Sequence, residues 1–296
     1  YNSQVGVPLS VLNTNQNHDL GIFEAGISEV EEMQNLFKIL KPNLGVFTGI
    51  GTAHEGGFKD IHQKIKEKLK LFKNVDHLFL CVDDPKVMKQ ISSNQNIFGY
   101  SLEGNTAAVQ VQGVQREGNG SLVLYTYEDR NMGVWIPFTD HASIQNALLC
   151  IVLLHYLKIS DKDIMDGFAG LSAVEMRLEV KRTSGGGVLI NDAYNSDLDS
   201  IKIALEFMNR VDEGRKKCLI LSDVLGSKQQ KKELYEKVSF LINAAKLDYL
   251  YLVGETITQF KHLFKAKRIE KLTTTSDLIE SLASIQIDDL CILVKG

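Results

Sequence analysis

The sequence predicts an α/β protein built from two parallel-sheet units, the first of which also carries a small antiparallel β part. Three observations support this fold class. Short apolar runs alternate with amphipathic helical runs near the start of the chain, and residues 97–138 alternate in polarity as antiparallel strands do. The strand–helix alternation then restarts after residue 176. We therefore predict one domain over residues 1–176 and a second over residues 177–296.

Composition and charge narrow the class of function. The chain has 296 residues, 44% of them hydrophobic and 24% charged, as expected for a globular protein with sizeable cores. The net charge of −4 gives no basic surface for nucleic acid. The sequence shows neither a signal peptide nor an apolar run of the roughly 18–20 residues that span a bilayer. Because the chain starts at Tyr1 and stops just after a predicted strand, we expect a piece of a longer protein.

The four cysteines are far apart in the sequence and form no CxxC pair. Three of them lie in apolar, strand-like runs. We therefore expect buried thiols in a reducing compartment.

The first unit is predicted to begin with a strand, a helix and a second strand. The strand 20–23 ends at Glu24, and the strand 45–50 leads into a loop with four glycines that presents His54. Ligands of open parallel sheets bind at the carboxyl ends of strands, where both side chains fall. Mg²⁺ would stabilise a carboxylate there, whereas a helix cap or a loop salt bridge is an equally open interpretation. A lone loop histidine is often incidental, but glycines allow a ligand to approach closely.

The next predicted helix, 59–73, places a lysine on its apolar face. That face is made by Ile61, Ile65, Leu69 and Phe72. Lys68 falls near its centre and Lys64 toward its edge. Such a lysine extends its amine to solvent, loses its proton or is chemically modified. A neutral amine can add CO₂, and the resulting carbamate presents oxygens that bind Mg²⁺.

The rest of the first domain contains a strand, an antiparallel part and two helices. A buried strand is predicted over 75–82, the antiparallel strands follow, and helices are predicted over 140–157 and 160–171. Asn146 lies in the first turn of the longer helix, where its amide could read a flat ring or simply be a polar residue near the cap. His155 falls on the core-facing side of that helix, so we expect a packed histidine.

The second domain reads as a Rossmann-like alternation of strands and helices. Strands are predicted over 188–191, 218–222, 249–253 and 290–294, with helices over 200–208 and 231–245. The glycine-rich stretch 184–187 precedes its strand, so we predict a turn there and not a phosphate loop.

At this point several short motifs line up in one order along nearly the whole chain, and they resemble those of the Mur ligases. They are YNSQVGVPLSVL, EAGIS, TGIGTAHEGGF, EKLKLF, the helix containing Asn146-Ala147-Leu148, MRLE, NDAYNSDLDS and ILVKG. The strongest likeness is to the branch that adds D-alanyl-D-alanine to UDP-N-acetylmuramoyl-tripeptide. The stretch LSDVLGSK is also similar to the forms of that branch that are fused ahead of an alanine racemase.

The resemblance implies a P-loop-type central ATPase domain, truncated at its start, and ATP-driven amide formation in cytoplasmic peptidoglycan synthesis. By position, Glu24 and His54 match the family's Mg²⁺ ligands and Lys68 its carbamylated lysine. Asn146 matches an adenine-reading asparagine. In the second domain, Arg177 matches the family's arginine that contacts the nucleotide phosphate, and Asp192 matches its ribose-binding aspartate. Tyr194 and Asn195 lie in the same nucleotide-facing loop.

The sequence departs from the family in one important respect. It contains no GxxxxGK[ST] phosphate loop, which in the family lies just upstream of the position of Tyr1. We therefore expect that these residues alone do not turn over ATP. Another Mur-type ligase, a folylpolyglutamate synthase-like ligase and a non-catalytic nucleotide-binding module remain alternative interpretations.

Overall fold

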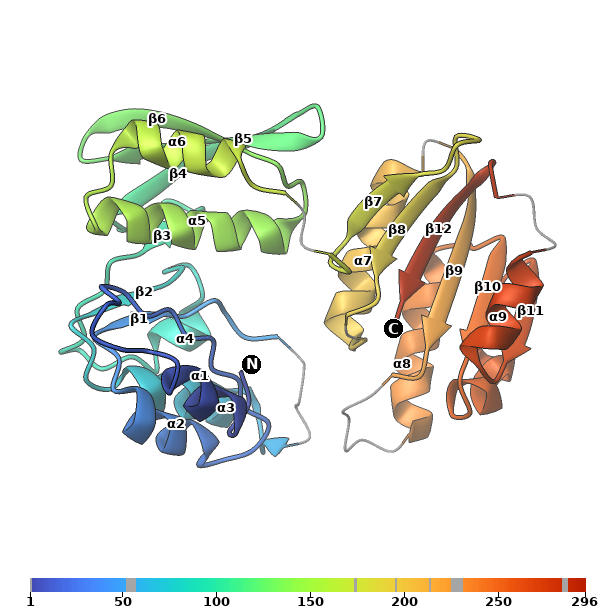
Figure 1. Ribbon diagram of the computed structural model, residues 1–296, viewed down its shortest axis with the longest axis horizontal. Helices are drawn as coiled ribbons and strands as arrows, with labels where there is room; N and C mark the ends of the chain where they lie inside the picture. The colour runs from blue at the N-terminus through green and yellow to red at the C-terminus, as the bar shows by residue number, and fades with distance from the viewer. Residues whose placement is uncertain are drawn as a thin grey trace. The chain divides into compact units, whose positions relative to one another are not determined.

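The computed structural model describes residues 2–51, 57–172, 175–194, 196–212, 214–224, 231–283 and 287–296 (Figure 1). The chain divides into two compact units. Unit 1 comprises Tyr1–Ile50 and His54–Ser172, and unit 2 comprises Gly51–Ala53 and Ala173–Gly296. Both units combine helices with parallel or mixed sheets, so the predicted α/β class is confirmed.

The first half of unit 1 is a small parallel α/β layer. Its elements are α1 Gly6–Val11, α2 Glu32–Leu40, β1 Leu44–Val46, α3 Ile61–Leu69 with the 3-10 turn η2 Lys70–Phe72, β2 His77–Phe79 and α4 Pro85–Met88. β1 and β2 pair in parallel. The Asp60 side chain caps α3 by accepting a hydrogen bond from the Gln63 backbone N–H at 2.8 Å. The apolar face of α3 packs on the sheet through Ile65, which is 1% exposed.

The strand predicted over 20–23 is not formed in this part of the chain. Residues 20–27 have no regular secondary structure, and Leu20 and Ile22 are 60% and 83% exposed. A strand requires a neighbour for its backbone hydrogen bonds, and a short apolar run alone does not supply one. The backbone N–H of Gly26 instead donates to the Asn2 carbonyl at 2.8 Å.

The second half of unit 1 is a four-stranded sheet covered by helices, and here the prediction is confirmed. The strands are β3 Tyr100–Ser101, β4 Val109–Glu117, β5 Gly120–Tyr127 and β6 Arg130–Ile136. β4, β5 and β6 pair antiparallel, whereas β3 pairs with β4 in parallel. α5 His141–Tyr156 and α6 Asp161–Ala169 contribute Leu148, Ile151 and Ile164 to the core that the sheet shares with them.

His155 is a packed histidine, as predicted. Its ring is 4% exposed, lies 3.0 Å from the Tyr125 hydroxyl through Nε2 and stacks on Tyr127 at 4.1 Å between ring centroids. Burial lowers the pKa of His155, and the Asp161 carboxylate opposes this effect.

Unit 2 is a six-stranded sheet in the order β11-β10-β9-β12-β8-β7. Its elements are β7 Glu179–Arg182, β8 Val188–Asp192, α7 Leu198–Val211, β9 Lys216–Ser222, α8 Lys231–Ala244, β10 Tyr249–Val253, η3 Ile257–Leu263, β11 Arg268–Leu272, α9 Thr275–Leu282 and β12 Leu290–Lys295. All neighbouring strands are parallel except β7 and β8. α7 and α8 cover one face and α9 the other (Figure 1).

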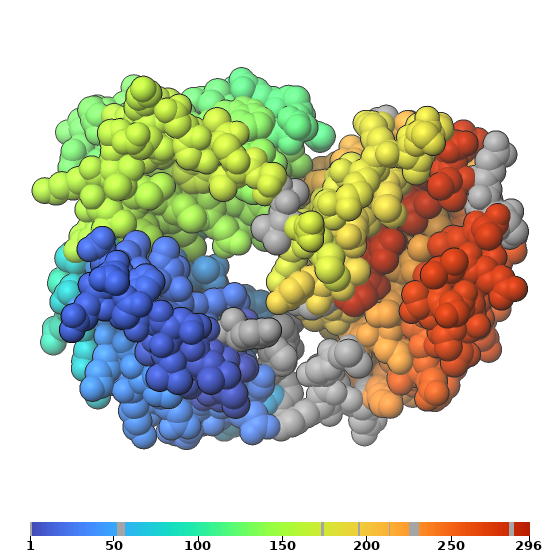
Figure 2. Space-filling model, in the orientation of Figure 1, coloured from blue at the N-terminus to red at the C-terminus, as the bar shows by residue number. Residues whose placement is uncertain are grey.

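The order of the strands makes β12 the centre of unit 2. The chain runs outward from β8 past the position of β12 to β9, β10 and β11, and then returns to place β12 between β8 and β9. Figure 2 shows β12 as a red stripe between the yellow and orange parts of this face. The carboxyl ends of β8, β12 and β9 are therefore neighbours, at the edge where parallel sheets bind ligands.

The four cysteines are all free thiols, but they differ in burial. Cys218 and Cys291 are buried as expected, whereas Cys81 is half-buried and Cys150 is exposed. Of the helices in the described ranges, none has the length and apolar character that crossing a bilayer demands.

Candidate functional site

A buried ion pair joins the carboxyl ends of β8 and β12. Asp192 ends β8 and lies directly opposite Lys295 of β12 in the parallel register. The Lys295 Nζ donates to Asp192 Oδ2 at 2.8 Å and lies 3.4 Å from the Asp192 carbonyl oxygen. The Lys295 side chain is 1% exposed and the Asp192 side chain 10%, so only the carboxylate reaches the surface.

The segment that enters unit 2 brings an arginine to the same place. Met176 and Leu178 both adopt left-handed backbone angles, with φ of 60° and 50°. This conformation is uncommon for residues other than glycine, and such strain gathers at ligand sites. It lets the Leu178 N–H donate to Asp192 Oδ1 at 3.2 Å. The Arg177 guanidinium lies 3.9 Å from the centroid of the Tyr194 ring.

The structure thus brings Arg177, Asp192 and Tyr194 together, three of the residues singled out from the sequence. Burial raises the pKa of Asp192, while the ion pair with Lys295, the Leu178 N–H and the charge of Arg177 oppose that rise. The carboxylate is held on both oxygens and keeps lone pairs for a ligand, because each carboxylate oxygen accepts two hydrogen bonds.

The loop after β8 offers a further polar group. The Ser196 hydroxyl is buried and has no hydrogen-bond partner among the described residues. Buried polar groups are nearly always paired, so this unpaired hydroxyl is a group that a ligand can satisfy. α7 begins next to it with a capping box between Asp197 and Ser200. Asn195, the remaining residue predicted in this loop, lies outside the described residues.

This arrangement suits a nucleotide. A fixed carboxylate accepts hydrogen bonds from vicinal ribose hydroxyls, a guanidinium binds phosphate oxygens, and an exposed aromatic ring offers a stacking surface. All three groups come from the carboxyl edge of the sheet or the segment packed on it.

The predicted metal ligands lie in unit 1 and are described in part. Glu24 is exposed, and its Oε1 accepts a hydrogen bond from the Asn2 side-chain amide at 2.8 Å. Since the preceding strand is absent, Glu24 extends from an irregular segment and not from a strand end. His54 lies outside the described residues.

Lys68 is half-buried on α3, and its Nζ lies 3.4 Å from the Gly49 carbonyl oxygen. Burial lowers the pKa of Lys68, and the charge of Lys64 lowers it further. The expected order of burial is reversed, because Lys64, which was placed at the edge of the apolar face, is only 3% exposed. In the part of the chain that the structure describes, Glu24 and Lys68 have different partners, the Asn2 amide and the Gly49 carbonyl.

Asn146 of unit 1 is exposed on α5. Because that helix begins at His141, Asn146 lies in its second turn and not in the first. Within the described ranges, no three His, Cys, Asp or Glu side chains are grouped to hold a metal ion.

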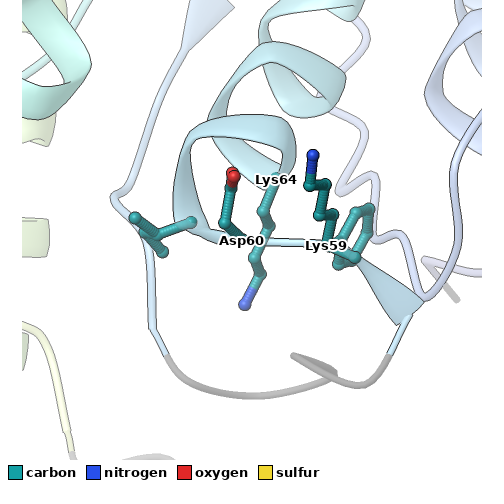
Figure 3. Close-up of a pocket in the computed structure, with 5 residues that line it drawn as sticks. Lys59, Asp60 and Lys64 are labelled. Carbon is teal, nitrogen blue, oxygen red and sulfur yellow. The ribbon is translucent and has the colours of Figure 1, made fainter.

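A pocket of about 200 Å³ lies at the start of α3 (Figure 3). It is lined by Phe58, Lys59, Asp60, Ile61 and Lys64. Figure 3 shows the amines of Lys59 and Lys64 pointing in opposite directions, with the Asp60 carboxylate on the Lys59 side. Neither Glu24 nor Lys68 lines this pocket, and its amines do not converge on one point, so we assign it no role.

Sequence reasoning missed Lys295. The residue ends an apolar strand, where a lysine is usually read as the first solvent-exposed position. The signal that could have found it is the parallel register: Asp192 and Lys295 each end a central strand of the same sheet. The partners are 103 positions apart in sequence, so local patterns do not connect them.

Known proteins resemble this chain along most of its length. The Mur ligase middle domain matches residues 1–154, and the Mur ligase glutamate ligase domain matches residues 176–296. UDP-N-acetylmuramoyl-tripeptide–D-alanyl-D-alanine ligase of Bacillus subtilis is 27% identical over 290 residues, which cover 95% of this chain and 62% of that protein.

Solved structures show the same fold. A MurF structure from Acinetobacter baumannii has a TM-score of 0.80 at 19% identity, covering 100% of this chain and 65% of that one. The MurF ligase of Thermotoga maritima, solved in complex with ADP, also has a TM-score of 0.80 at 19% identity, covering 98% and 67%. The chain therefore covers between 62% and 67% of the length of these three proteins.

Proposed function

The chain belongs to the Mur ligase family, and from that membership we propose that it is the metal- and nucleotide-binding part of a MurF-type ligase. Such an enzyme adds D-alanyl-D-alanine to UDP-N-acetylmuramoyl-tripeptide, using ATP, in peptidoglycan synthesis. One observation carries the choice within the family: the likeness to the Bacillus subtilis ligase of that name extends over 95% of the chain.

The proposed reaction needs ATP because a carboxylate is a poor electrophile. The tripeptide carboxylate attacks the γ-phosphorus of ATP, which gives an acyl phosphate and ADP. The amine of D-alanyl-D-alanine then attacks the acyl carbon, the bond from that carbon to the phosphate oxygen breaks, and inorganic phosphate leaves as the amine loses its proton. Cations must neutralise the charge that develops on the phosphoryl oxygens.

In unit 2, we assign the nucleotide to the cluster at the carboxyl edge. Asp192 would accept hydrogen bonds from the ribose, Arg177 would contact phosphate, and Tyr194 and Asn195 would line the same loop. The distances that support this assignment are the 3.9 Å between Arg177 and Tyr194 and the 3.2 Å from Leu178 N–H to Asp192. Asn146 of unit 1 is the proposed adenine contact, and its exposed amide is available for one.

In unit 1, we propose that Glu24, His54 and a carbamylated Lys68 hold Mg²⁺, which would supply positive charge to the phosphoryl oxygens. Two features of the described residues support this proposal. Glu24 offers an exposed carboxylate, and carbamate oxygens are hard ligands of the kind that Mg²⁺ prefers. The half-buried position of Lys68 suits an amine that adds CO₂, because burial disfavours its charged form.

We also propose a cytoplasmic location and a racemase domain further along the complete protein. The four free cysteines fit a reducing cytoplasm. The likeness of residues 221–228 to the forms fused to alanine racemase supports a racemase domain further along the complete protein, which its intact mass would test.

An isotope experiment tests the proposed function. The complete protein is supplied with ATP, D-alanyl-D-alanine and tripeptide substrate carrying ¹⁸O in its reacting carboxylate. An acyl phosphate route transfers one ¹⁸O to the released phosphate for each amide formed. Phosphate without the label would contradict the acyl phosphate route. Amide formation with another amine in preference to D-alanyl-D-alanine would contradict the proposed substrate and favour another Mur-type or folylpolyglutamate synthase-like ligase. Nucleotide binding with no amide formed would favour a non-catalytic module.

A further inference from the structure

Lys295 is the charged residue of unit 2 whose burial most needs an explanation. Its side chain is 1% exposed at the end of β12, a strand whose other residues are apolar. A buried ion pair is often no more stabilising than a well-packed apolar pair of similar volume. Stability alone therefore does not account for a lysine at this position, and a role in the neighbouring site is the better explanation.

The geometry determines how Lys295 can act. Its Nζ is directed at Asp192 Oδ2 at 2.8 Å, while its side chain has almost no exposed surface with which to touch a ligand. Asp192 does reach the surface, with 10% of its side chain exposed. Any effect of Lys295 on a ligand therefore passes through the carboxylate.

The parallel register fixes this contact. Lys295 and Asp192 are opposite residues of hydrogen-bonded neighbouring strands, so their backbones are held at a constant separation. The Leu178 N–H holds the other carboxylate oxygen at 3.2 Å. With one donor on each oxygen, the carboxylate is restricted in its rotation, and lone pairs remain on it to accept hydrogen bonds from a ligand.

We propose that Lys295 is a positioning residue that keeps the Asp192 carboxylate charged and correctly oriented to accept hydrogen bonds from the ribose hydroxyls of the nucleotide. This inference rests on the proposed function, because it takes Asp192 as the ribose contact. Without the lysine ammonium, a carboxyl group that is nine-tenths buried takes up a proton or rotates, and it then accepts hydrogen bonds less well.

Two nucleotides separate this role from a merely structural one. ADP carries both ribose hydroxyls, and 2′,3′-dideoxy-ADP lacks them but keeps the base and the phosphates. The readout is the ratio of the two dissociation constants, measured by calorimetry on the complete protein. In the parent we expect ADP to bind at least about ten-fold more tightly, since hydrogen bonds to a charged acceptor discriminate by at least that much.

The variants are Lys295→Met, Lys295→Gln and Asp192→Asn, with Lys202→Met on the exposed side of α7 as the matched control. We expect the ratio to fall to about one to two in Lys295→Met and Asp192→Asn and to be unchanged in Lys202→Met. Lys295→Gln keeps a donor without the charge, so it should give an intermediate ratio. It also decides the question if Lys295→Met does not fold.

The outcomes are distinguishable. If Lys295→Met and Lys295→Gln keep the parental ratio, even with both affinities reduced, the lysine is only structural or acts on the phosphates, and the inference is wrong. If the parent does not discriminate, or Asp192→Asn discriminates as the parent does, then Asp192 does not contact the ribose. The nucleotide site of the proposed function then fails, and this inference fails with it.

Discussion

Replacing Lys295 by methionine should destabilise unit 2 by a predictable amount. Methionine has a similar volume, so the change removes the charge with little loss of packing. It leaves the Asp192 carboxylate 10% exposed, with the Leu178 N–H as its remaining described donor. Breaking a buried ion pair on one side costs about 3–5 kcal/mol, and the partial exposure of Asp192 favours the lower end, about 3 kcal/mol.

For a unit of roughly 120 residues, this corresponds to a fall of about 12 °C in melting temperature. Scanning calorimetry of the chain would measure it. The only tryptophan, Trp135 of β6, belongs to unit 1, so its fluorescence reports the unfolding of that unit separately. The Trp135 transition is the internal control and should not move with the Lys295 substitution.

The double variant Lys295→Met/Asp192→Asn provides the second part of this test. Removing both charges leaves no ion unpaired, so most of the lost stability should return. The loss should also depend on pH. Burial raises the pKa of Asp192, and without the lysine it rises further above its unfolded value of about 3.9. The variant is therefore least stable above that raised pKa and recovers as the pH falls through it, because the native state binds the proton first.

Two results would refute this reasoning. If the double variant were as unstable as Lys295→Met, the loss would come from packing and not from a stranded charge. If Lys295→Met cost less than about 1 kcal/mol at pH 8, the pair would behave as a surface ion pair, contrary to its burial.

Three further predictions concern other parts of the chain. Lys68→Ala should lower the ligase activity of the complete protein by about a hundred-fold or more, and a short carboxylic acid should restore part of it. No loss of activity, or an equal loss in the exposed control Lys66→Ala, would argue against a carbamate. Because burial lowers the pKa of His155, the melting temperature of unit 1 should be highest above pH about 6.5 and should fall on acidification. His155→Gln should reduce this dependence of the melting temperature on pH. An unchanged dependence would mean that other groups cause it. Asp197→Ala removes the cap of α7 and should cost unit 2 about 1 kcal/mol in denaturant unfolding, with exposed Glu206→Ala as a control; equal costs would show that the cap contributes nothing specific.

Periodicity predicted much of the fold because the strongest elements carry their own pattern. β10 has the predicted bounds, and α5 and α8 differ from prediction by a residue or two at their ends. β7 and β11 were not predicted, because EVKR and RIEKL are too charged to resemble typical strands. Both are outer strands of the sheet, where one side of the strand has no neighbour and polar residues are tolerated.

The candidate site was predictable only where a motif was local. Arg177, Asp192 and Tyr194 were found through short motifs, and the structure brings them together. The prediction of a strand before Glu24 was wrong, since forming a strand depends on a partner that no local pattern specifies. Lys295 was missed for the same physical reason, because its ion pair with Asp192 depends on the register between two strands that are far apart in sequence.

The most direct test of the central claim is phosphate release by the complete protein in the presence of ATP and UDP-N-acetylmuramoyl-tripeptide. We predict release that depends on D-alanyl-D-alanine, with one phosphate for each amide formed, and its loss in Glu24→Ala. Phosphate release at the same rate without the dipeptide, or amide formation with no phosphate released, would contradict the proposal that this chain is part of an ATP-driven D-alanyl-D-alanine ligase.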